Sequence, residues 1–418
     1  MQEENRQRLI AYFESGIKPA GYPPTLGLEL EHFAVTNDGA PVTYDGQPGI
    51  RELLHALVVS GAYPHALTTP EGQLIGAAGT DGVVSLEPAA QVEISLAPFD
   101  RIDDIAAAYQ RFRAAVDPEL AREGAHLVAS GYHPTRRARE LVLIPKDRYR
   151  FMDAYFDQLG TQGLRMMRAT ASTQVSVNYS SEADAVRKLR VASALAPVLA
   201  ALTNNTQVFE GAPAQAPLTR LAVWRDVDPA RCGQIPGLFE PGFGFGAYAD
   251  WLLGLSPIFI TRPAADDPTG PALRSFPATP AREAYADAPM TTDDIEHLIS
   301  MVWPDVRLKR YVEIRPADSL PAPQAMGYTA LIKGLMYSDD SLDLVEKTLG
   351  VVDNRWPLGP EATDHAIAAI RRDGDQALVH GVPLTRWYDL LLDASAAALS
   401  SEERSYLDAL RTALGRAA

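Results

Sequence analysis

Carboxylates recur in this sequence within short segments that alternate between apolar and polar side chains. In Leu26-Gly-Leu-Glu-Leu-Glu-His-Phe33, the leucines occupy one set of alternate positions, and Gly27, Glu29 and Glu31 occupy the other. Residues two apart on a β-strand share a face and lie roughly 6.5 Å apart. The pattern therefore predicts a strand with a leucine face and, opposite it, two neighbouring carboxylates. His32 falls on the leucine side, which favours a packed histidine over a metal ligand.

Three other segments repeat this alternation. Their polar faces consist of Gln91, Glu93 and Ser95 in Gln91–Leu96, of Gln174, Ser176 and Asn178 in Thr173–Tyr179, and of Glu313 and Arg315 in Tyr311–Arg315. One such strand alone is typical of an antiparallel sheet with a solvated side. A solvated face commonly mixes lysine, threonine and acids, whereas these faces carry several glutamates and no lysine.

The glutamates on these faces point to metal chemistry. Like charges side by side on a sheet repel each other and lower stability. A divalent cation removes that cost, and Mg²⁺ in particular binds carboxylate and phosphate oxygens together. The four faces therefore favour a metal–nucleotide site built from Glu29, Glu31, Glu93 and Glu313. From the residues alone, a plain sheet with a solvated side remains the alternative.

Basic residues stand close to these segments in the sequence. They are Arg165 and Arg168 before the Gln174 strand, Arg220, Arg225 and Arg231 around residues 220–231, and Arg307, Lys309 and Arg310 before Glu313. Arginine suits bidentate binding of a carboxylate or a phosphate. For most of them the alternative is an ordinary surface ion pair, but alternation puts Arg315 on the same face as Glu313.

Composition limits the classes of protein to consider. The chain has 418 residues, of which 46% are hydrophobic and 22% charged, as in ordinary globular proteins. The net charge of −15 argues against non-specific binding to nucleic acid or anionic membranes. No apolar run approaches the roughly 20 residues of a membrane span, and the N-terminus does not resemble a signal peptide. With Cys232 as its one cysteine, the chain is expected to be a cytoplasmic protein that binds neither nucleic acid nor membrane.

Helical patterns complement the predicted strands. Ser181 to Asp184 reads as an N-terminal cap for a helix that continues to Leu202, and further helices are predicted over Asp293–Val302 and Ser401–Leu414. We expect one domain over residues 1–418, with a loop insertion at 261–290 and a helical region at 325–418. The sequence contains no phosphate-binding P-loop, no nucleophile elbow and no histidine- or cysteine-based zinc motif.

The sequence resembles the plant-type glutamate–cysteine ligase family. The resemblance extends from about Gly27 to Tyr337, and its blocks occur in the order of the family. The blocks are residues 27–31, 87–95, 131–134, 145–152, 163–175, 224–233 and 307–318. One block alone is weak evidence, whereas this many in order are specific.

The resemblance implies an α+β fold with a glutamine-synthetase-like catalytic core, in which a curved antiparallel sheet forms a half-open barrel and helices pack outside. It implies an ATP-dependent ligase that phosphorylates the side-chain carboxyl of L-glutamate. The amine of L-cysteine then attacks the γ-glutamyl phosphate. The expected cofactors are ATP and on the order of two or three Mg²⁺ ions, which Mn²⁺ could replace. The expected assembly is a monomer or a homodimer.

The resemblance also implies roles for single residues. Glu29, Glu31, Glu93 and Glu313 are expected to bind metal, with Glu31, Glu313 and Arg315 as the catalytic residues. Arg315, Arg220, Gln91, Gln174, Ser176 and Asn178 are expected to contact substrates, and Arg231 and Lys309 to contact ATP or phosphate.

Two departures from the family pattern leave alternatives open. The chain has Glu-Pro-Ala-Ala-Gln at 87–91 where the family often has two glycines, and Gln-Val-Ser-Val-Asn at 174–178 where it often has Gln-Val-Asn-Leu-Asp. The changes at Ser176 and Asn178 make a γ-glutamyl ligase with a different amine an alternative to glutamate–cysteine ligase. A second alternative is a non-catalytic descendant that binds glutamate or nucleotide.

Overall fold

The structure is a computed structural model, and it describes residues 1–261, 274–275 and 278–416. Its centre is an antiparallel sheet of nine strands, counted over these residues. The strand order is β14-β15-β7-β1-β5-β4-β3-β2, and β6 pairs with the last residues of β1. The strands are β1 (Leu26–Thr36), β2 (His65–Thr68), β3 (Leu74–Gly79), β4 (Gly82–Leu86), β5 (Val92–Leu96), β6 (Ala125–Val128), β7 (Thr173–Val177), β14 (Val306–Leu308) and β15 (Val312–Ile314).

The sheet is open, because β14 and β2 are its edge strands and are not paired with each other within the described residues. Short two-stranded sheets lie outside it. They are β8 (Val208–Phe209) with β9 (Ala212–Pro213), β10 (Cys232–Gly233) with β13 (Trp303–Pro304), β11 (Phe259–Ile260) with β12 (Arg274–Ser275), and β16 (Leu378–Val379) with β17 (Val382–Pro383).

Helices surround the sheet. In the first half of the chain they are α1 (Gln2–Glu14), α2 (Ile50–Val59), α3 (Ile102–Arg122), α4 (Asp147–Leu159), α5 (Gly163–Ala169) and α6 (Glu182–Leu202). In the second half they are α7 (Thr219–Arg225), α8 (Phe245–Gly254), α9 (Ala281–Ala284), α10 (Thr292–Ile299), α11 (Ala322–Met336), α12 (Asp339–Leu349), α13 (Ala362–Asp373), α14 (Leu384–Ala398), α15 (Ser401–Arg404) and α16 (Asp408–Ala413). Short 3₁₀ turns are η1 (Ala138–Glu140), η2 (Gly374–Gln376) and η3 (Ser405–Leu407).

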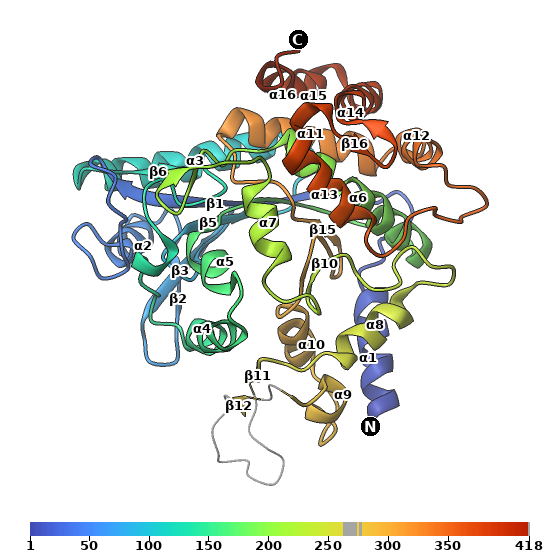
Figure 1. The fold of residues 1–418 in the computed structure, drawn as a ribbon. Coiled ribbons are helices and arrows are strands. Elements are labelled where there is room, and N and C mark those ends of the chain that lie inside the picture. Colours follow the sequence, from blue (N-terminus) through green and yellow to red (C-terminus); the bar gives the residue numbers. More distant parts are fainter. Residues whose placement is uncertain (262–273, 276–277, 417–418) are drawn as a thin grey trace.

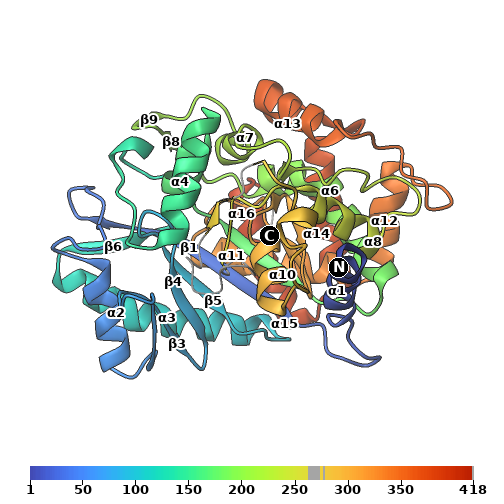
Figure 2. The same cartoon turned by 90° about the horizontal axis from the view of Figure 1, so that it is seen from below.

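The two faces of the sheet have different neighbours. Leu26, Leu28 and Leu30 are fully buried on the apolar face. On this side lie α3 and α11, with the C-terminal helices above them (Figure 1). Helices α4, α5, α7 and α10 lie on the other side, and Figure 2 shows α4, α7 and α10 around strands β1, β4 and β5. The alternation in β1 thus directs its leucines into a core and its glutamates toward a second layer of helices.

The open antiparallel sheet with helices packed against it confirms the predicted fold class. The predicted helix cap is also confirmed, since the Ser181 hydroxyl accepts a hydrogen bond from the backbone N–H of Asp184 at the start of α6. The helix expected over Asp293–Val302 is α10, and the one expected over Ser401–Leu414 is divided into α15, η3 and α16.

Part of the predicted loop insertion at 261–290, residues 262–273 and 276–277, lies outside the described residues. The remainder of that segment includes β12 and α9. In the part of the chain that the structure describes, we find no helix with the length and apolar character needed to cross a membrane.

Candidate active site

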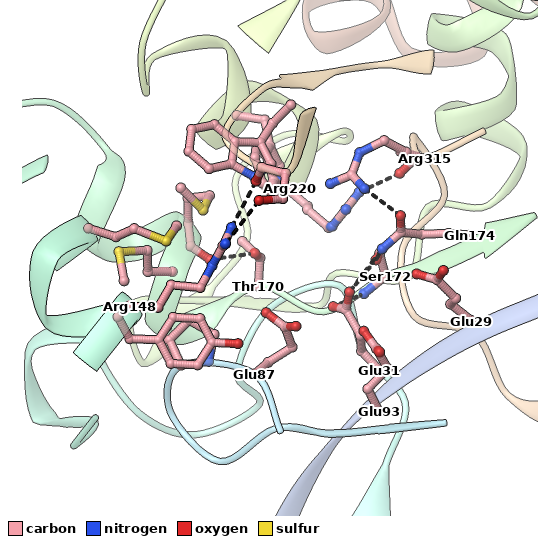
Figure 3. Close-up of a pocket in the computed structure, with 18 of the residues that line it drawn as sticks. Glu29, Glu31, Glu87, Glu93, Arg148, Thr170, Ser172, Gln174, Arg220 and Arg315 are labelled. Atoms are coloured by element: carbon pink, nitrogen blue, oxygen red, sulfur yellow. Dashed lines mark hydrogen bonds between the residues drawn. The ribbon is translucent and has the colours of Figure 1, made fainter. Parts of the chain in front are cut away.

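A pocket of about 320 Å³ opens between the polar face of the sheet and helices α4, α5 and α7 (Figure 3). This volume is in the range of small-molecule sites. Its lining is strongly polar and carries both signs of charge. It consists of Glu29, Glu31, Glu87, Pro88, Glu93, Lys146, Arg148, Tyr149, Met152, Met166, Met167, Thr170, Ser172, Gln174, Arg220, Trp224, Ser300, Trp303, Arg307 and Arg315.

Four carboxylates form one wall of the pocket. Glu29 and Glu31 come from β1, and Glu93 from β5, where the antiparallel register sets Glu93 directly opposite Glu31. Glu87 follows β4 and completes the group, which occupies the lower part of Figure 3. Strand pairing thus brings together acidic residues that are up to 64 positions apart in the sequence.

Burial raises the pKa of all four carboxyl groups, and neighbouring carboxylates add to this effect for Glu29, Glu87 and Glu93. Burial, followed by the charges of Glu93 and Glu313, raises the pKa of Glu29 to about 7. Burial, followed by the charges of Glu93 and Glu31, raises the pKa of Glu87 to about 8. The pKa values of Glu31 and Glu93 are raised as well, with burial as the first cause. The surroundings therefore do not compensate full ionisation of the wall, and without a bound cation part of it stays protonated at neutral pH.

Hydrogen bonds divide the wall into two kinds of carboxylate. Glu31 accepts from the backbone N–H of Ser172 at 2.8 Å, from its hydroxyl at 2.8 Å and from Gln174 Nε2 at 3.1 Å. Glu93 accepts from two serine hydroxyls, on residues 85 and 95, at 2.8 and 2.9 Å. By contrast, neither Glu29 nor Glu87 has a side-chain hydrogen bond or ion pair within the described residues. Their oxygens are free to bind a ligand.

The chemistry of this wall fits a hard divalent cation that arrives with other ligands. Within the described residues, no group of three or more histidine, cysteine, aspartate or glutamate side chains is placed so that it could hold a metal ion by itself. Mg²⁺ does not need one, because it keeps several waters and binds through one or two carboxylates plus substrate phosphates. Glu29, free of hydrogen bonds, and the facing pair Glu31 and Glu93 are the residues suited to hold it.

Opposite the carboxylates, two arginines meet at Trp224 of α7. The guanidinium carbons of Arg220 and Arg315 lie 5.9 and 5.7 Å from the centre of its indole ring. Arg220 is 3% exposed, and its Nη1 donates to the carbonyls of Arg315 and Pro316, at 3.3 Å each. Its Nε and the Trp224 Nε1 are buried without a hydrogen-bond partner within the described residues. This end of the pocket is therefore rich in donors and suits an anion.

Gln174 joins the two ends of the pocket. Its Oε1 accepts from Arg315 Nη1 at 2.5 Å, and its Nε2 donates to Glu31 Oε1 at 3.1 Å and to the Ser172 hydroxyl at 3.0 Å. Both ends of its amide are thus occupied. In this arrangement Gln174 orients Arg315 and Glu31, and its predicted contact with a substrate stays a prediction.

Glu313 is fully buried next to Arg315, at the end of the pocket that is rich in donors. Its carboxylate accepts from Arg307 Nε at 2.7 Å, Lys309 Nζ at 3.0 Å and Arg315 Nη1 at 3.0 Å. Burial alone would raise the pKa of Glu313, but these three cations hold it well below its usual range. In this structure Glu313 acts as the counterion of three basic side chains, and it does not line the pocket. Its predicted role as a metal ligand stays a prediction.

Five other predicted site residues lie outside the pocket lining. Gln91 is 2% exposed, and its amide is bound to the backbone of residues 89, 167, 168 and 170. Arg231 bonds to Asp228 and to the carbonyls of residues 256 and 301. Lys309 is occupied by Glu313 and by the Tyr311 hydroxyl.

Ser176 and Asn178 are the other two. Ser176 stands opposite Gly27 and Glu313 in the sheet. Asn178 follows the end of β7, where alternation stops, and its Nδ2 donates to the Pro23 carbonyl and the Thr25 hydroxyl.

As predicted, His32 is packed, with Nε2 2.9 Å from the Tyr109 hydroxyl, and burial lowers its pKa to about 4.

The pocket also contains residues to which the sequence analysis gave no role: Glu87, Lys146 and Arg148. Ser85 lies opposite Glu93 in the β4–β5 ladder, so extending the alternation by two residues would have placed Glu87 on the same face. The turn after Glu87 holds Ala90 at a φ of 67°, a left-handed conformation that glycine adopts more readily. Lys146 and Arg148 belong to the helical layer and follow no strand alternation, so the signal that could have found them is the family block at residues 145–152.

Comparison with protein families matches residues 25–416 to glutamate-cysteine ligase family 2 (GCS2). The chain is 34% identical over 343 residues to a chloroplastic glutamate–cysteine ligase of Arabidopsis thaliana, a match that covers 81% of this chain and 64% of the relative. It is 32% identical over 342 residues to the chloroplastic glutamate–cysteine ligase B of Oryza sativa subsp. japonica, a match that covers 81% of this chain and 68% of that relative. The chain thus matches slightly less than two thirds of the Arabidopsis protein.

Among solved structures, the chain resembles glutamate–cysteine ligase from Francisella tularensis in complex with AMP. The TM-score is 0.52 at 11% identity, and the match covers 94% of this chain and 82% of the other. At that identity the likeness concerns the fold, and it agrees with the open antiparallel sheet described above.

The raised pKa of Glu87 predicts a pH-dependent stability for the metal-free protein. A carboxyl with a higher pKa in the folded state destabilises the fold once it ionises, so this effect is absent below about pH 4.5 and complete above about pH 8. Glu87→Gln should therefore unfold at higher urea concentration than the wild type at pH 8.5, and the difference should shrink toward pH 4.5. The exposed Glu71→Gln serves as the control. If the difference in unfolding urea concentration between variant and wild type is the same at every pH in this range, or is absent at pH 8.5, the raised pKa of Glu87 is contradicted.

Proposed function

The chain belongs to glutamate-cysteine ligase family 2, and from that premise we propose that it is an ATP-dependent ligase. It joins the side-chain carboxyl of L-glutamate to the amine of L-cysteine and forms γ-glutamylcysteine. The observation that carries this proposal is the division of the pocket into a wall of four carboxylates and a facing group of arginines. A carboxylate wall suits metal-bound phosphates, and arginines suit the carboxylates of an amino acid.

The proposed reaction has two steps. First, the terminal phosphoryl group of ATP moves to a side-chain carboxylate oxygen of glutamate, which gives ADP and an acyl phosphate. The neutral amine of the acceptor then attacks the acyl carbon. A C–N bond forms, the bond from that carbon to the phosphate oxygen breaks, phosphate leaves, and the nitrogen gives up one further proton. Positioning and charge neutralisation account for most of the catalysis of phosphoryl transfer.

Each part of the pocket has a task in this scheme. Glu29, Glu31 and Glu93 would hold Mg²⁺, which when bound neutralises phosphate charge. Arg315 and Arg220 bind the carboxylates of glutamate. Gln174 keeps Arg315 and Glu31 in fixed relation, because it is hydrogen-bonded to both. Glu313 also holds Arg315 in place, because it accepts a hydrogen bond from Arg315 Nη1. No residue of the chain serves as a covalent nucleophile.

The structure supports cysteine as the acceptor in one respect. The departures from the family pattern at Ser176 and Asn178 are the reason to consider another amine. Both residues are absent from the lining of the pocket, and Asn178 is bonded to the segment that precedes β1. These two departures therefore lie outside the lining of the pocket.

The proposal is tested by ADP release with ATP, Mg²⁺ and L-glutamate against a panel of amines that includes L-cysteine, with the product mass recorded. We expect release that requires both amino acids and a product with the mass of γ-glutamylcysteine. Turnover with a different amine alone would keep the chemistry and replace the acceptor. No turnover with any amine would refute the ligase and favour a binding protein.

Glu29→Gln tests the metal assignment. The substitution keeps the shape of the side chain and removes a free carboxylate, so we expect at least about a 100-fold loss of kcat, in line with the loss of metal ligands or their supports. The variant should also lose the rise in melting temperature that Mg²⁺ with ATP gives the wild type. Its own melting temperature without metal should stay equal or rise, because a repelling charge is gone. Retained turnover together with a retained Mg²⁺ effect would remove Glu29 from the metal site.

Arg315→Lys tests the glutamate-binding arginines. Lysine keeps the positive charge but not the planar, two-pronged donor geometry. The KM for L-glutamate should rise about tenfold or more, which corresponds to losing one charge-assisted hydrogen bond. The KM for ATP should change little. Arg310→Lys, at an exposed arginine paired with Glu296, is the matched control. An unchanged glutamate KM would show that Arg315 does not bind the donor.

A further inference from the structure

A second cavity, of about 730 Å³, lies outside the candidate active site and shares none of its lining residues. It is bounded by α6, by α12 and by the loops at residues 242–243 and 351–356. In Figure 1 and Figure 2, α6 and α12 lie apart from α4, which borders the candidate active site. The volume is in the range of small-molecule sites, and no step of the proposed reaction uses this cavity.

Arg190 of α6 is a buried charge in the lining of this cavity, with 4% of its surface exposed. Its Nε donates to the carbonyl of Leu238 at 2.8 Å, and its Nη2 donates to the carbonyl of Glu240 at 2.7 Å. Its Nη1 donates to Asn354 Oδ1 at 3.3 Å. An arginine has five N–H donors, so one on each Nη remains free. All three partners are neutral oxygens, which fix the guanidinium but leave its charge uncompensated.

No carboxylate pairs with Arg190. It has no ion pair within the described residues, whereas Arg187, one turn earlier on α6, contacts Asp339, Asp343 and Glu346. Burial lowers the pKa of Arg190, and the charge of Glu346 opposes that shift only in part. A buried charge without a partner is costly. The free donors and the uncompensated charge therefore suit an anion that enters through the cavity.

Two further donors line the same cavity. Trp356 is 8% exposed, and its indole Nε1 is buried without a hydrogen-bond partner among the residues that the structure describes. Lys347 of α12 is exposed and has no hydrogen bond or ion pair in the same part of the chain. With Arg190, they bring one uncharged and two charged donors to a single cavity.

The rest of the lining limits the kind of anion. Its apolar surface comes from Val186, Phe243, Val351 and the ring of Trp356. Its acidic residues are Asp343 and Glu346, which are paired with Arg187, together with Glu182 and Asp353. These acids repel a polyanion such as a nucleotide. A single negative charge on an apolar body matches the lining best.

We propose that this cavity binds a small monocarboxylate with an apolar body. The carboxylate is held by Arg190, with Trp356 Nε1 and Lys347 as further donors. The planar guanidinium suits the two oxygens of a carboxylate, and the apolar body packs against the aromatic wall. The proposal does not depend on the ligase reaction, because it concerns a cavity apart from the candidate active site.

The test compares two acids with their neutral amides. Binding of phenylacetate, phenylacetamide, hexanoate and hexanamide to the full chain is measured by isothermal titration calorimetry. We expect each acid to bind at least about tenfold more tightly than its amide, the effect of hydrogen bonds to a charged group.

Arg190→Met places the binding in this cavity. The variant should bind both acids at least about tenfold more weakly than the wild type and should bind the amides with unchanged affinity. Arg386→Met, at an exposed arginine of α14, is the control and should leave all four affinities unchanged. An acid that binds no more tightly than its amide, or a preference for the acid that survives in Arg190→Met, would overturn the proposal.

Two further variants keep the test decisive if Arg190→Met does not fold. Lys347→Met removes an exposed charge that has no partner and should weaken binding of the acids about two- to fivefold. Trp356→Phe keeps an aromatic ring, removes the free N–H and should weaken binding of the acids about threefold or more. Unchanged affinity for the acids in both variants would show that the carboxylate binds elsewhere, and the proposal would fail.

Discussion

The crowding of four carboxylates on one face of the sheet is the constraint on which the rest of the pocket depends. The β1–β5 register sets Glu31 against Glu93, and the polar face adds Glu29 and Glu87 on either side. Adjacent like charges in a partly buried place lower the stability of the fold. The pKa values of Glu29 and Glu87 are raised to about 7 and 8 for this reason, because ionising either group is costly in the folded state. A fold that keeps such a wall must offset its cost elsewhere or use it to bind cations.

The remaining polar residues of the pocket hydrogen-bond to the carboxylates of this wall or balance their charge. Serine hydroxyls and a backbone N–H satisfy Glu31 and Glu93, whereas Glu29 and Glu87 keep free oxygens. Gln174 connects Glu31 to Arg315, so the acidic and basic sides cannot shift independently. The same electrostatic arrangement thus explains both the order of the pocket and its use.

The sequence predicted the faces of single strands well, because alternation is a local property of the chain. It could not predict register, which brought Glu93 opposite Glu31, and it failed where alternation stops. Asn178 follows the last residue of β7, and Gln91 precedes the first residue of β5, so their side chains satisfy nearby backbone groups instead of facing the pocket. Arg148 belongs to the helical layer, whose docking on the sheet is a property of the whole fold and is not encoded in a local pattern.

The central claim is that this pocket activates a carboxylate by phosphoryl transfer. It is tested most directly with glutamate labelled with ¹⁸O in both side-chain carboxyl oxygens, with turnover in the presence of ATP, Mg²⁺ and L-cysteine. The acyl phosphate route predicts one ¹⁸O in each phosphate released and one in the new amide carbonyl. Unlabelled phosphate alongside a γ-glutamyl product would contradict the account, because the carboxylate oxygen would then never have been bonded to phosphorus.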